Sequence, residues 1–199
     1  MPKIVNSDEK INFICEKAYE EFIKNGINNF SLNKFIQSLN MSKGQFYHYF
    51  KTKEELIFEV IDRKGQVVLD KTIQKVLNAN TFYDKLLALF SFYLDSTSLE
   101  NKPLYKLMKD TFYLYLNIEN QYIKQKNAEF YDLVLKILNE IFSEMIDKKY
   151  LKEDSKKFIP SLIATVDGMY LQSMILENYN LKEKLTNYLQ ILDDILKLK

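Results

Sequence analysis

Glycine and proline are scarce in this chain of 199 residues: four glycines and three prolines together occupy seven positions. A β-sheet protein needs turn residues about every 8–12 positions, and this chain does not have them. Apolar residues instead recur at intervals of three and four along most of the sequence, which is the spacing of amphipathic helices. The sequence therefore predicts an all-α fold.

Helix caps, glycine stops and the apolar period together predict nine helices. They are expected near residues 8–25, 32–39, 43–49, 53–78, 82–98, 102–116, 118–147, 155–178 and 181–197. Pro160 lies inside the eighth of these, so that helix either begins later or is kinked there. Gly65 lies inside the fourth, where it is either a hinge or an incidental helix glycine.

Composition narrows the class of protein further. Hydrophobic residues make up 47% of the chain and charged residues 28%, which is typical of globular proteins. The longest charge-free apolar runs, such as Leu86–Leu94 and Phe158–Val166, reach nine residues, whereas a membrane span needs about 20. Because the single cysteine, Cys15, cannot form an internal disulfide, we expect a reducing, cytoplasmic setting and no membrane partner.

The sequence also lacks the residue sets that catalysis needs. The chain has one histidine and one cysteine, and we find no nucleophile–base set, phosphate-binding loop or metal-ligand cluster. We therefore expect neither an enzyme, nor a cofactor, nor a metal site.

Charge is distributed unevenly along the chain. The net charge is +1, but residues 1–53 carry +3 and residues 54–199 carry −2. No acidic residue occurs between Glu21 and Glu54, and this interval contains five lysines: Lys24, Lys34, Lys43, Lys51 and Lys53. A basic stretch indicates a nucleic-acid partner, with a merely solvated face as the alternative.

Two short helices joined by a tight turn at Asn40-Met41 lie within this basic stretch, which is the helix-turn-helix pattern. Phe46 and Phe50 are four residues apart on the second helix and are expected to point into the core together. The opposite side carries Lys43, Gly44, Tyr47 and His48. Such a face has no use in a core, so it predicts contact with a partner, and the second helix of this motif reads the DNA major groove. Gly44 removes side-chain bulk where the backbone approaches the groove.

The run Phe30-Ser31-Leu32 … Leu39-Asn40-Met41-Ser42-Lys43-Gly44-Gln45-Phe46-Tyr47-His48-Tyr49-Phe50-Lys51-Thr52-Lys53-Glu54-Glu55-Leu56 resembles the DNA-binding signature of the TetR family of bacterial transcriptional regulators. The resemblance covers roughly residues 8–60. It departs from the family at Ile36, where Ala is usual, and at Asn40, where Gly is usual. It implies a helix-turn-helix DNA-binding domain at residues 1–52 and a helical ligand-binding and dimerisation domain at residues 53–199, with residues 53–78 as the connecting helix.

The resemblance also implies the DNA contacts. Base edges would be met by Lys43, Gly44, Gln45, Tyr47 and His48. Phosphates would be held by Tyr47, Tyr49 and Lys53, and the backbone or a flanking base by Ser31 and Asn33. Gln45 has an alternative role, because Ser42-Lys43-Gly44-Gln45 matches the capping-box pattern. The single arginine, Arg63, lies outside the helix-turn-helix, so arginine–guanine readout by the recognition helix is excluded and A·T-rich half-sites are favoured.

The second domain is rich in tyrosine, phenylalanine and methionine. Most of these residues are expected in the core, but several amphipathic tyrosines and adaptable methionines in one bundle suit a mostly apolar ligand cavity. Our candidate ligand-binding residues are Tyr93, Met108, Phe112, Tyr131 and Gln172.

Two apolar stripes lie near the end of the chain. The last helix carries Leu181, Leu185, Tyr188, Leu192 and Ile195, and the helix before it carries Leu162, Val166, Met169 and Ser173. Their spacing is typical of helix bundles, and it predicts a homodimer through the last two helices, with intramolecular core as the alternative.

With these patterns, the resemblance implies a ligand-responsive regulator, a repressor that a small, mostly apolar molecule releases from a palindromic double-stranded DNA operator. The alternative is a helical adaptor that binds protein through the same exposed face.

Overall fold

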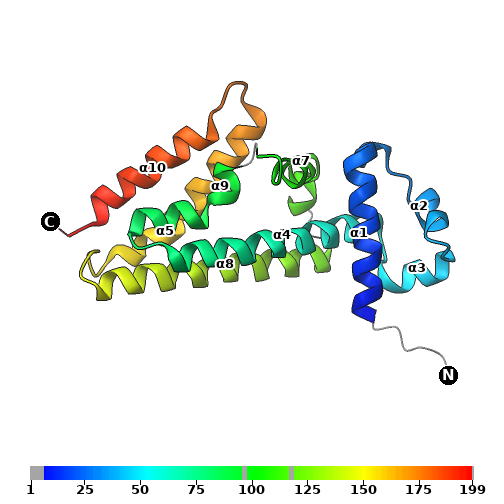
Figure 1. Ribbon diagram of the computed structural model, residues 1–199, viewed down its shortest axis with the longest axis horizontal. Coiled ribbons are helices and arrows are strands. Elements are labelled where there is room, and N and C mark those ends of the chain that lie inside the picture. Colours follow the sequence, from blue (N-terminus) through cyan, green and yellow to red (C-terminus); the bar gives the residue numbers. More distant parts are fainter. Residues whose placement is uncertain (1–6, 96–97, 117–118, 199) are drawn as a thin grey trace. The chain divides into compact units, whose positions relative to one another are not determined.

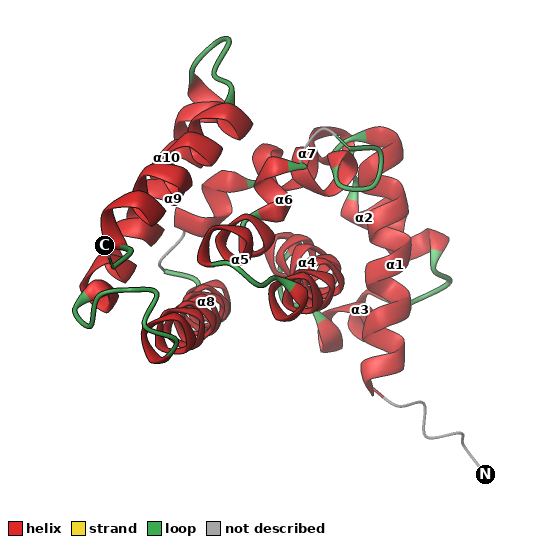
Figure 2. Cartoon of the chain, turned by 60° about the vertical axis from the view of Figure 1, so that its left-hand side comes forward, coloured by secondary structure: helices red, strands yellow, loops and turns green. Residues whose placement is uncertain are grey.

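The computed structural model describes residues 7–95, 98–116 and 119–198 (Figure 1). Regular structure in this part of the chain is helical (Figure 2), apart from an isolated antiparallel bridge between Leu151 and Lys197. The chain divides into two compact units, Met1–Val67 with Lys102–Lys126 and Val68–Asn101 with Asn127–Lys199. The all-α fold class expected from the sequence is confirmed. The functional boundary expected between residues 52 and 53 stays a prediction.

The first unit is built on a chain of phenylalanine rings. It contains α1 (Ser7–Asn25), η1 (Ile27–Asn29), α2 (Leu32–Ser38), α3 (Lys43–Tyr49), the first part of α4 (Lys53–Asn78), α7 (Lys102–Asp110), η2 (Phe112–Leu116) and the first residues of α8 (Gln121–Asp147). Successive ring centroids lie 4.7, 5.2, 6.5 and 5.6 Å apart along Phe22, Phe30, Phe35, Phe46 and Phe50. These contacts join the end of α1 to α2 and α3 through buried, directional aromatic packing.

The turn between α2 and α3 depends on one left-handed residue. Asn40 has a φ of 53°, its N–H donates to the Gln37 carbonyl at 3.0 Å, and the Met41 N–H donates to the Ile36 carbonyl at 3.4 Å. This pair of bonds is the Schellman arrangement that ends a helix. Asparagine adopts the left-handed region more readily than most residues. It can therefore end α2 at a position where the TetR signature that the sequence resembles usually has glycine.

Ion pairs tie α1 and α8 to α4 within the first unit. Arg63 on α4 contacts Asp8 on α1 at 2.6 Å and Glu59 on its own helix at 2.8 Å. The hydroxyl of Tyr122 on α8 also donates to Glu59. Two further pairs follow the same pattern, Lys64 with Glu16 at 2.6 Å and Lys126 with Asp62 at 3.0 Å.

Cys15 lies among these helices and is 2% exposed. Burial raises the pKa of its thiol to about 12, with the neighbouring Glu59 carboxylate acting in the same direction. A thiol that stays protonated is a poor nucleophile, so Cys15 serves as a small core residue.

The second unit is a helical bundle around α10. It contains the rest of α4 and α8 with α5 (Phe82–Leu89), α6 (Ser91–Leu94), η3 (Ser155–Phe158), α9 (Ile159–Ile175) and α10 (Leu181–Leu196). α10 packs against α5, α6 and α9. The face that it buries consists of Leu181, Leu185, Leu189, Leu192 and Leu196. Much of the stripe assigned to the dimer is therefore intramolecular core: Leu162, Val166, Leu181, Leu185 and Leu192 are all buried.

Helix boundaries differ from the sequence prediction at several places. The described residues contain ten α-helices instead of nine, because the helix predicted at 82–98 is divided at Phe90, whose carbonyl accepts from Tyr93, only three residues on. The helix predicted at 102–116 ends at Asp110, where the buried Thr111 hydroxyl donates back to the Leu107 carbonyl at 2.7 Å. Residues 96–97, near the end of the helix predicted at 82–98, and residue 118, the start of the helix predicted at 118–147, lie outside the described residues.

Pro160 lies at the start of α9, preceded by the short helix η3. The alternative in which the eighth predicted helix begins later is therefore correct, since proline fits the first turn, where its missing N–H has no partner to lose. α4 continues through Gly65 without a break. No helix in the described part of the chain combines the length and the apolar character that a membrane crossing requires.

The left-handed conformation at Asn40 leads to a stability prediction. We expect Asn40→Gly to leave the free energy of unfolding nearly unchanged and Asn40→Val to lower it by about 1–2 kcal/mol, because a β-branched residue is strained at positive φ. Urea denaturation followed by circular dichroism measures both. Asn28→Val, at an exposed position in η1, is the matched control, and equal losses at Asn28 and Asn40 would contradict the role of the turn.

Candidate nucleic-acid interface

The two sides of α3 have opposite character. Phe46 and Phe50 are 0% and 4% exposed and join the core of the first unit. The other side of the helix presents exposed residues, namely Lys43, Gly44, Gln45, Tyr47 and His48. Tyr47 is 40% exposed although it is aromatic. α3 is thus anchored by one face and offers the other, with its polar and aromatic groups, to a partner.

A complete capping box holds the start of α3. The Ser42 hydroxyl accepts from the Gln45 N–H at 3.2 Å, and the Gln45 side-chain oxygen accepts from the Ser42 N–H at 2.9 Å. The capping alternative for Gln45 is therefore correct for the protein without DNA. Bidentate recognition of adenine uses both the oxygen and the nitrogen of a glutamine amide, so Gln45 must leave the cap before it can read a base in that way.

Lys51, Thr52 and Glu55 join the end of α3 to the start of α4. The ammonium of Lys51 donates to the Tyr47 carbonyl at 3.0 Å. This bond gives a partner to one of the carbonyl groups that the end of a helix leaves unpaired. The Thr52 hydroxyl accepts from the Glu55 N–H at 3.0 Å. The Glu55 carboxylate accepts from the N–H of Lys51, at 2.8 Å, one residue before the position expected in a standard capping box.

Lys53 links the start of α4 to the start of α2. Its ammonium donates to the Phe30 carbonyl at 3.3 Å and lies 5.5 Å from the centroid of the Phe30 ring. The next residue, Ser31, is the N-cap of α2, but its side chain makes no capping bond. A lysine cation therefore lies beside the beginning of α2, where Ser31 and Asn33 are exposed.

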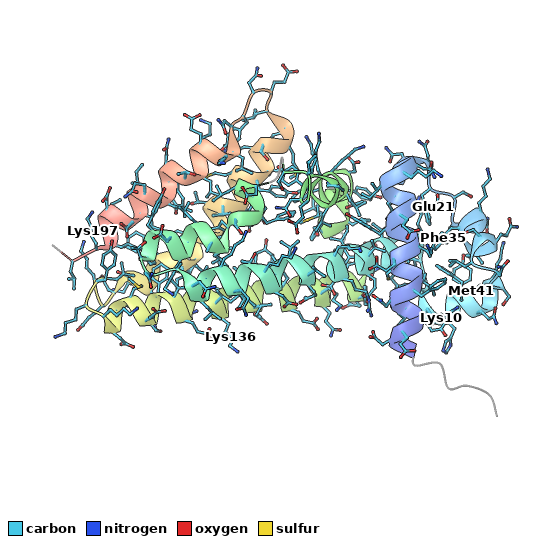
Figure 3. All side chains as sticks on the ribbon, viewed as in Figure 1. Lys10, Glu21, Phe35, Met41, Lys136 and Lys197 are labelled. Carbon is cyan, nitrogen blue, oxygen red and sulfur yellow. The ribbon has the colours of Figure 1, made fainter. Side chains whose placement is uncertain are left out.

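A surface hollow of about 410 Å³ lies beside α3. Its lining consists of Lys10, Leu39, Asn40, Met41, Gly44, Gln45, His48 and Tyr49. Three predicted base-contact residues and Tyr49 thus share one concavity with the turn. Lys10 and Met41 are labelled in Figure 3.

Lys10 is a basic residue of this face that was not among those predicted from the sequence. It directly follows the acidic residues Asp8 and Glu9, so the local charge pattern did not indicate a basic DNA-contact residue there. A signal was present, however, because Lys10 continues the four-residue spacing of the buried positions Ile14, Ala18 and Phe22. A residue one turn before a buried stripe lies on the same helix face, at its open end.

The five candidate ligand-binding residues fall into both units. Met108 and Phe112 belong to the first, and Met108 packs against its core. The other three, Tyr93, Tyr131 and Gln172, belong to the second. Within it the Tyr131 hydroxyl donates to Asp167 at 2.8 Å, and the ring of Tyr93 lies 5.1 Å from that of Tyr170. Gln172 is exposed. Among the described residues, no cluster of three or more histidine, cysteine, aspartate or glutamate side chains could hold a metal ion.

This geometry defines a helix-turn-helix domain carried by a larger all-helical protein. Residues 14–60 match the family model described as bacterial regulatory proteins, tetR family. The chain is 34% identical over 73 residues to the uncharacterized HTH-type transcriptional regulator YuxN of Bacillus subtilis (strain 168), a match that covers 37% of this chain and 24% of that protein.

Solved structures extend the likeness to the whole fold. A transcriptional regulator of the TetR family from Cytophaga hutchinsonii superposes with a TM-score of 0.75 at 22% identity and covers 99% of both chains. A transcriptional regulator from Saccharomonospora viridis, solved in complex with choline, has a TM-score of 0.73 at 14% identity and covers 96% of this chain and 100% of that chain. Residues 14–60 therefore match the DNA-binding segment of the tetR family, and solved regulators of that family share the fold of the chain.

Gly44 provides a test that separates partner contact from folding. A Cβ added there would meet only the Ser42 hydroxyl oxygen, at 4.0 Å, so Gly44→Ala is expected to raise the free energy of unfolding by up to about 1 kcal/mol through helix propensity. If the backbone meets DNA at this point, the added methyl group costs about 1–3 kcal/mol, which weakens DNA binding roughly tenfold or more. Thermal denaturation and fluorescence polarisation measure the two effects; unchanged DNA affinity would remove Gly44 from the contact surface.

Proposed function

We propose that this protein is a transcriptional regulator that binds double-stranded DNA through α3. The observation that carries the proposal is the exposed set Lys43, Gly44, Gln45, Tyr47 and His48 on a helix whose other face is locked into a phenylalanine core. An exposed recognition helix on a rigid support is what insertion into the major groove requires. The regulator would act in the cytoplasm as a homodimer on a palindromic operator, with the two copies of α3 in successive major grooves about 34 Å apart.

Some residues of this face would contact bases, and others would contact phosphates. Lys43 can donate to guanine, and the ring of Tyr47 can cover a thymine methyl group. Lys53 and Lys10 supply cations at opposite ends of the face, beside α2 and beside the hollow. Lysine contacts to phosphate set orientation and affinity, and they carry no sequence information.

We further propose that the protein is a repressor whose effector, a small and mostly apolar molecule, binds in the second unit. α4 and α8 each contain residues of both units. Within the first unit, Tyr122 and Lys126 of α8 are bonded to Glu59 and Asp62 of α4. A change in the effector-bound state of α8 would thus reach α4, and coupling of this kind is typically worth about 1–3 kcal/mol.

The experiment that tests the proposal is a fluorescence-polarisation titration with the DNA upstream of the protein's own gene at several salt concentrations. Binding is expected to weaken linearly on a log–log plot against salt, because phosphate contacts release counterions. Absent binding, or binding that is indifferent to salt, would contradict the proposal and favour an adaptor that binds protein through the same face.

Two lysines should each account for about one phosphate contact. We expect Lys53→Ala and Lys10→Ala to weaken binding to all DNA sequences alike and to reduce the magnitude of the salt slope by about one each. Lys136→Ala, at an exposed position of α8 in the second unit (Figure 3), should leave the slope unchanged. Because Lys53 also donates to the Phe30 carbonyl, melting temperatures are measured alongside. A folded Lys53→Ala variant with an unaltered slope would exclude the phosphate contact.

The outer faces of α9 and α10 support the homodimer. Leu171 and Ile175 on α9 are 42% and 68% exposed, and Ile191 and Ile195 on α10 are 57% and 52% exposed. On α9 these leucine and isoleucine side chains continue the spacing of Gly168, where an added Cβ would meet nothing within 4 Å. Within the described residues, the helix surface at Gly168 is therefore open to a second copy. Exposed apolar side chains at helical spacing suit an interface between two copies.

The dimer is tested by placing a charge on this surface. Ile175→Glu is expected to raise the dimer dissociation constant at least about tenfold, because a carboxylate is costly to bury in an apolar interface. Light scattering after size-exclusion chromatography at low micromolar concentration measures the mass. Leu77→Glu, which alters a leucine of α4 that is 67% exposed, is the control and should leave the mass unchanged. A dimer that persists in Ile175→Glu would place the interface elsewhere.

A further inference from the structure

Asp167 is a half-buried carboxylate in the helical bundle of the second unit. It lies in the middle of α9 (Ile159–Ile175), and one of its oxygens accepts a hydrogen bond from the Tyr131 hydroxyl of α8 at 2.8 Å. Burial raises the pKa of this carboxyl group, and the hydrogen bond from Tyr131 offsets part of that effect. Within the described residues, Tyr131 is the one partner of this side chain.

Several other partly buried carboxylates are neutralised by a basic side chain. Glu59 pairs with Arg63 at 2.8 Å, and Asp62 pairs with Lys126 at 3.0 Å. In the second unit, Glu144 contacts the buried Lys85 at 3.1 Å, and also Lys148 at 2.6 Å. Asp167 differs from these paired carboxylates, and a carboxylate withdrawn from water is costly unless a cation or several donors compensate it.

Asp193 is the nearest parallel and shows what Asp167 lacks. Both of its oxygens accept from the Tyr150 hydroxyl, at 2.9 and 3.0 Å. Asp193 also has Lys197 one helical turn away, and its charge helps to raise the pKa of that lysine. Asp167 has a tyrosine donor of the same kind but no corresponding cation among the described residues.

Two further tyrosines belong to the same bundle as Asp167. Tyr170 follows it by three residues on α9, so the two side chains are neighbours on the helix surface. The ring of Tyr93 lies 5.1 Å from the ring of Tyr170, and Tyr131 itself remains 42% exposed. Electron-rich rings near a carboxylate are the surroundings in which proteins bind organic ammonium groups.

We propose that Asp167 and Tyr131 form the part of the effector site that binds a positively charged group, an alkylammonium head carried on an apolar tail. This inference rests on the proposed function, since it specifies the chemical class of the effector in the second unit. The carboxylate of Asp167 pairs with the cation, and the exposed ring of Tyr131 contacts its alkyl groups. Because Tyr131 is exposed and Asp167 is only half-buried, the cation reaches the carboxylate without unfolding of the bundle.

The test measures binding to the full-length protein without DNA, so its outcome is independent of whether the protein binds an operator. Isothermal titration calorimetry compares three probes that share a six-carbon tail: hexyltrimethylammonium, hexan-1-ol and hexanoate. We expect affinity to be highest for the cation, lower for the alcohol and lowest for the anion. Failure of operator binding would overturn the proposed function while leaving this ranking intact.

Two variants, each lacking one carboxylate charge, test whether the cation binds at Asp167. Asp167→Asn is expected to weaken hexyltrimethylammonium binding about tenfold or more and to leave hexan-1-ol binding unchanged, because a charge-assisted contact is lost. Asp132→Asn, at an exposed position beside Tyr131 on α8, is the matched control and should have no effect.

Several results would overturn the inference. They are the absence of hexyltrimethylammonium binding at millimolar concentration, equal affinity for the cation and the alcohol, or an Asp167→Asn variant that binds the cation as well as the native protein does. If Asp167→Asn does not fold, the ranking of the three probes on the native protein still decides the question.

Discussion

The contact on which the candidate DNA-binding face depends is the row of phenylalanine rings from Phe22 to Phe50. These rings come from α1, the segment before α2, α2 itself, and the middle and C-cap of α3, and their centroids follow one another at 4.7–6.5 Å. α3 has seven residues, too few to be a stable helix alone. Burial of Phe46 and Phe50 therefore supplies both its stability and its orientation, and the orientation leaves the opposite face exposed.

Several groups that hold this domain together are also candidates for DNA contact. The side-chain oxygen of Gln45 caps α3, and the ammonium of Lys53 is bonded to the Phe30 carbonyl. Binding to bases or phosphates has to compete with these internal bonds. The affinity of such a face is therefore the difference between new contacts and the bonds that are given up, and it is smaller than a count of contacts suggests.

The helical period, the caps and the glycine stop predicted most of the helices, because these signals are local. The same signals missed the division at Phe90 and the end of α7 at Asp110. There the backbone departs from the α-helix through a bond to a residue only three positions back and through a bond from the Thr111 side chain, and neither alters the spacing of apolar residues. Lys10 was missed for a related reason, since its place beside α3 follows from packing and not from its charged neighbours.

The sequence by itself determined the all-α class, the helix-turn-helix with its two-sided α3, and the tight turn at Asn40, because each follows from side-chain chemistry within a few residues. Only the tertiary structure decided which apolar stripes are internal. Leu185 and Leu192 are buried within the chain, whereas Ile191 and Ile195 of the same helix face outward. Tertiary packing likewise brought Tyr131 and Asp167 together across 36 positions. Helical spacing shows that a stripe exists, but its partner is set by contacts between residues far apart in the chain.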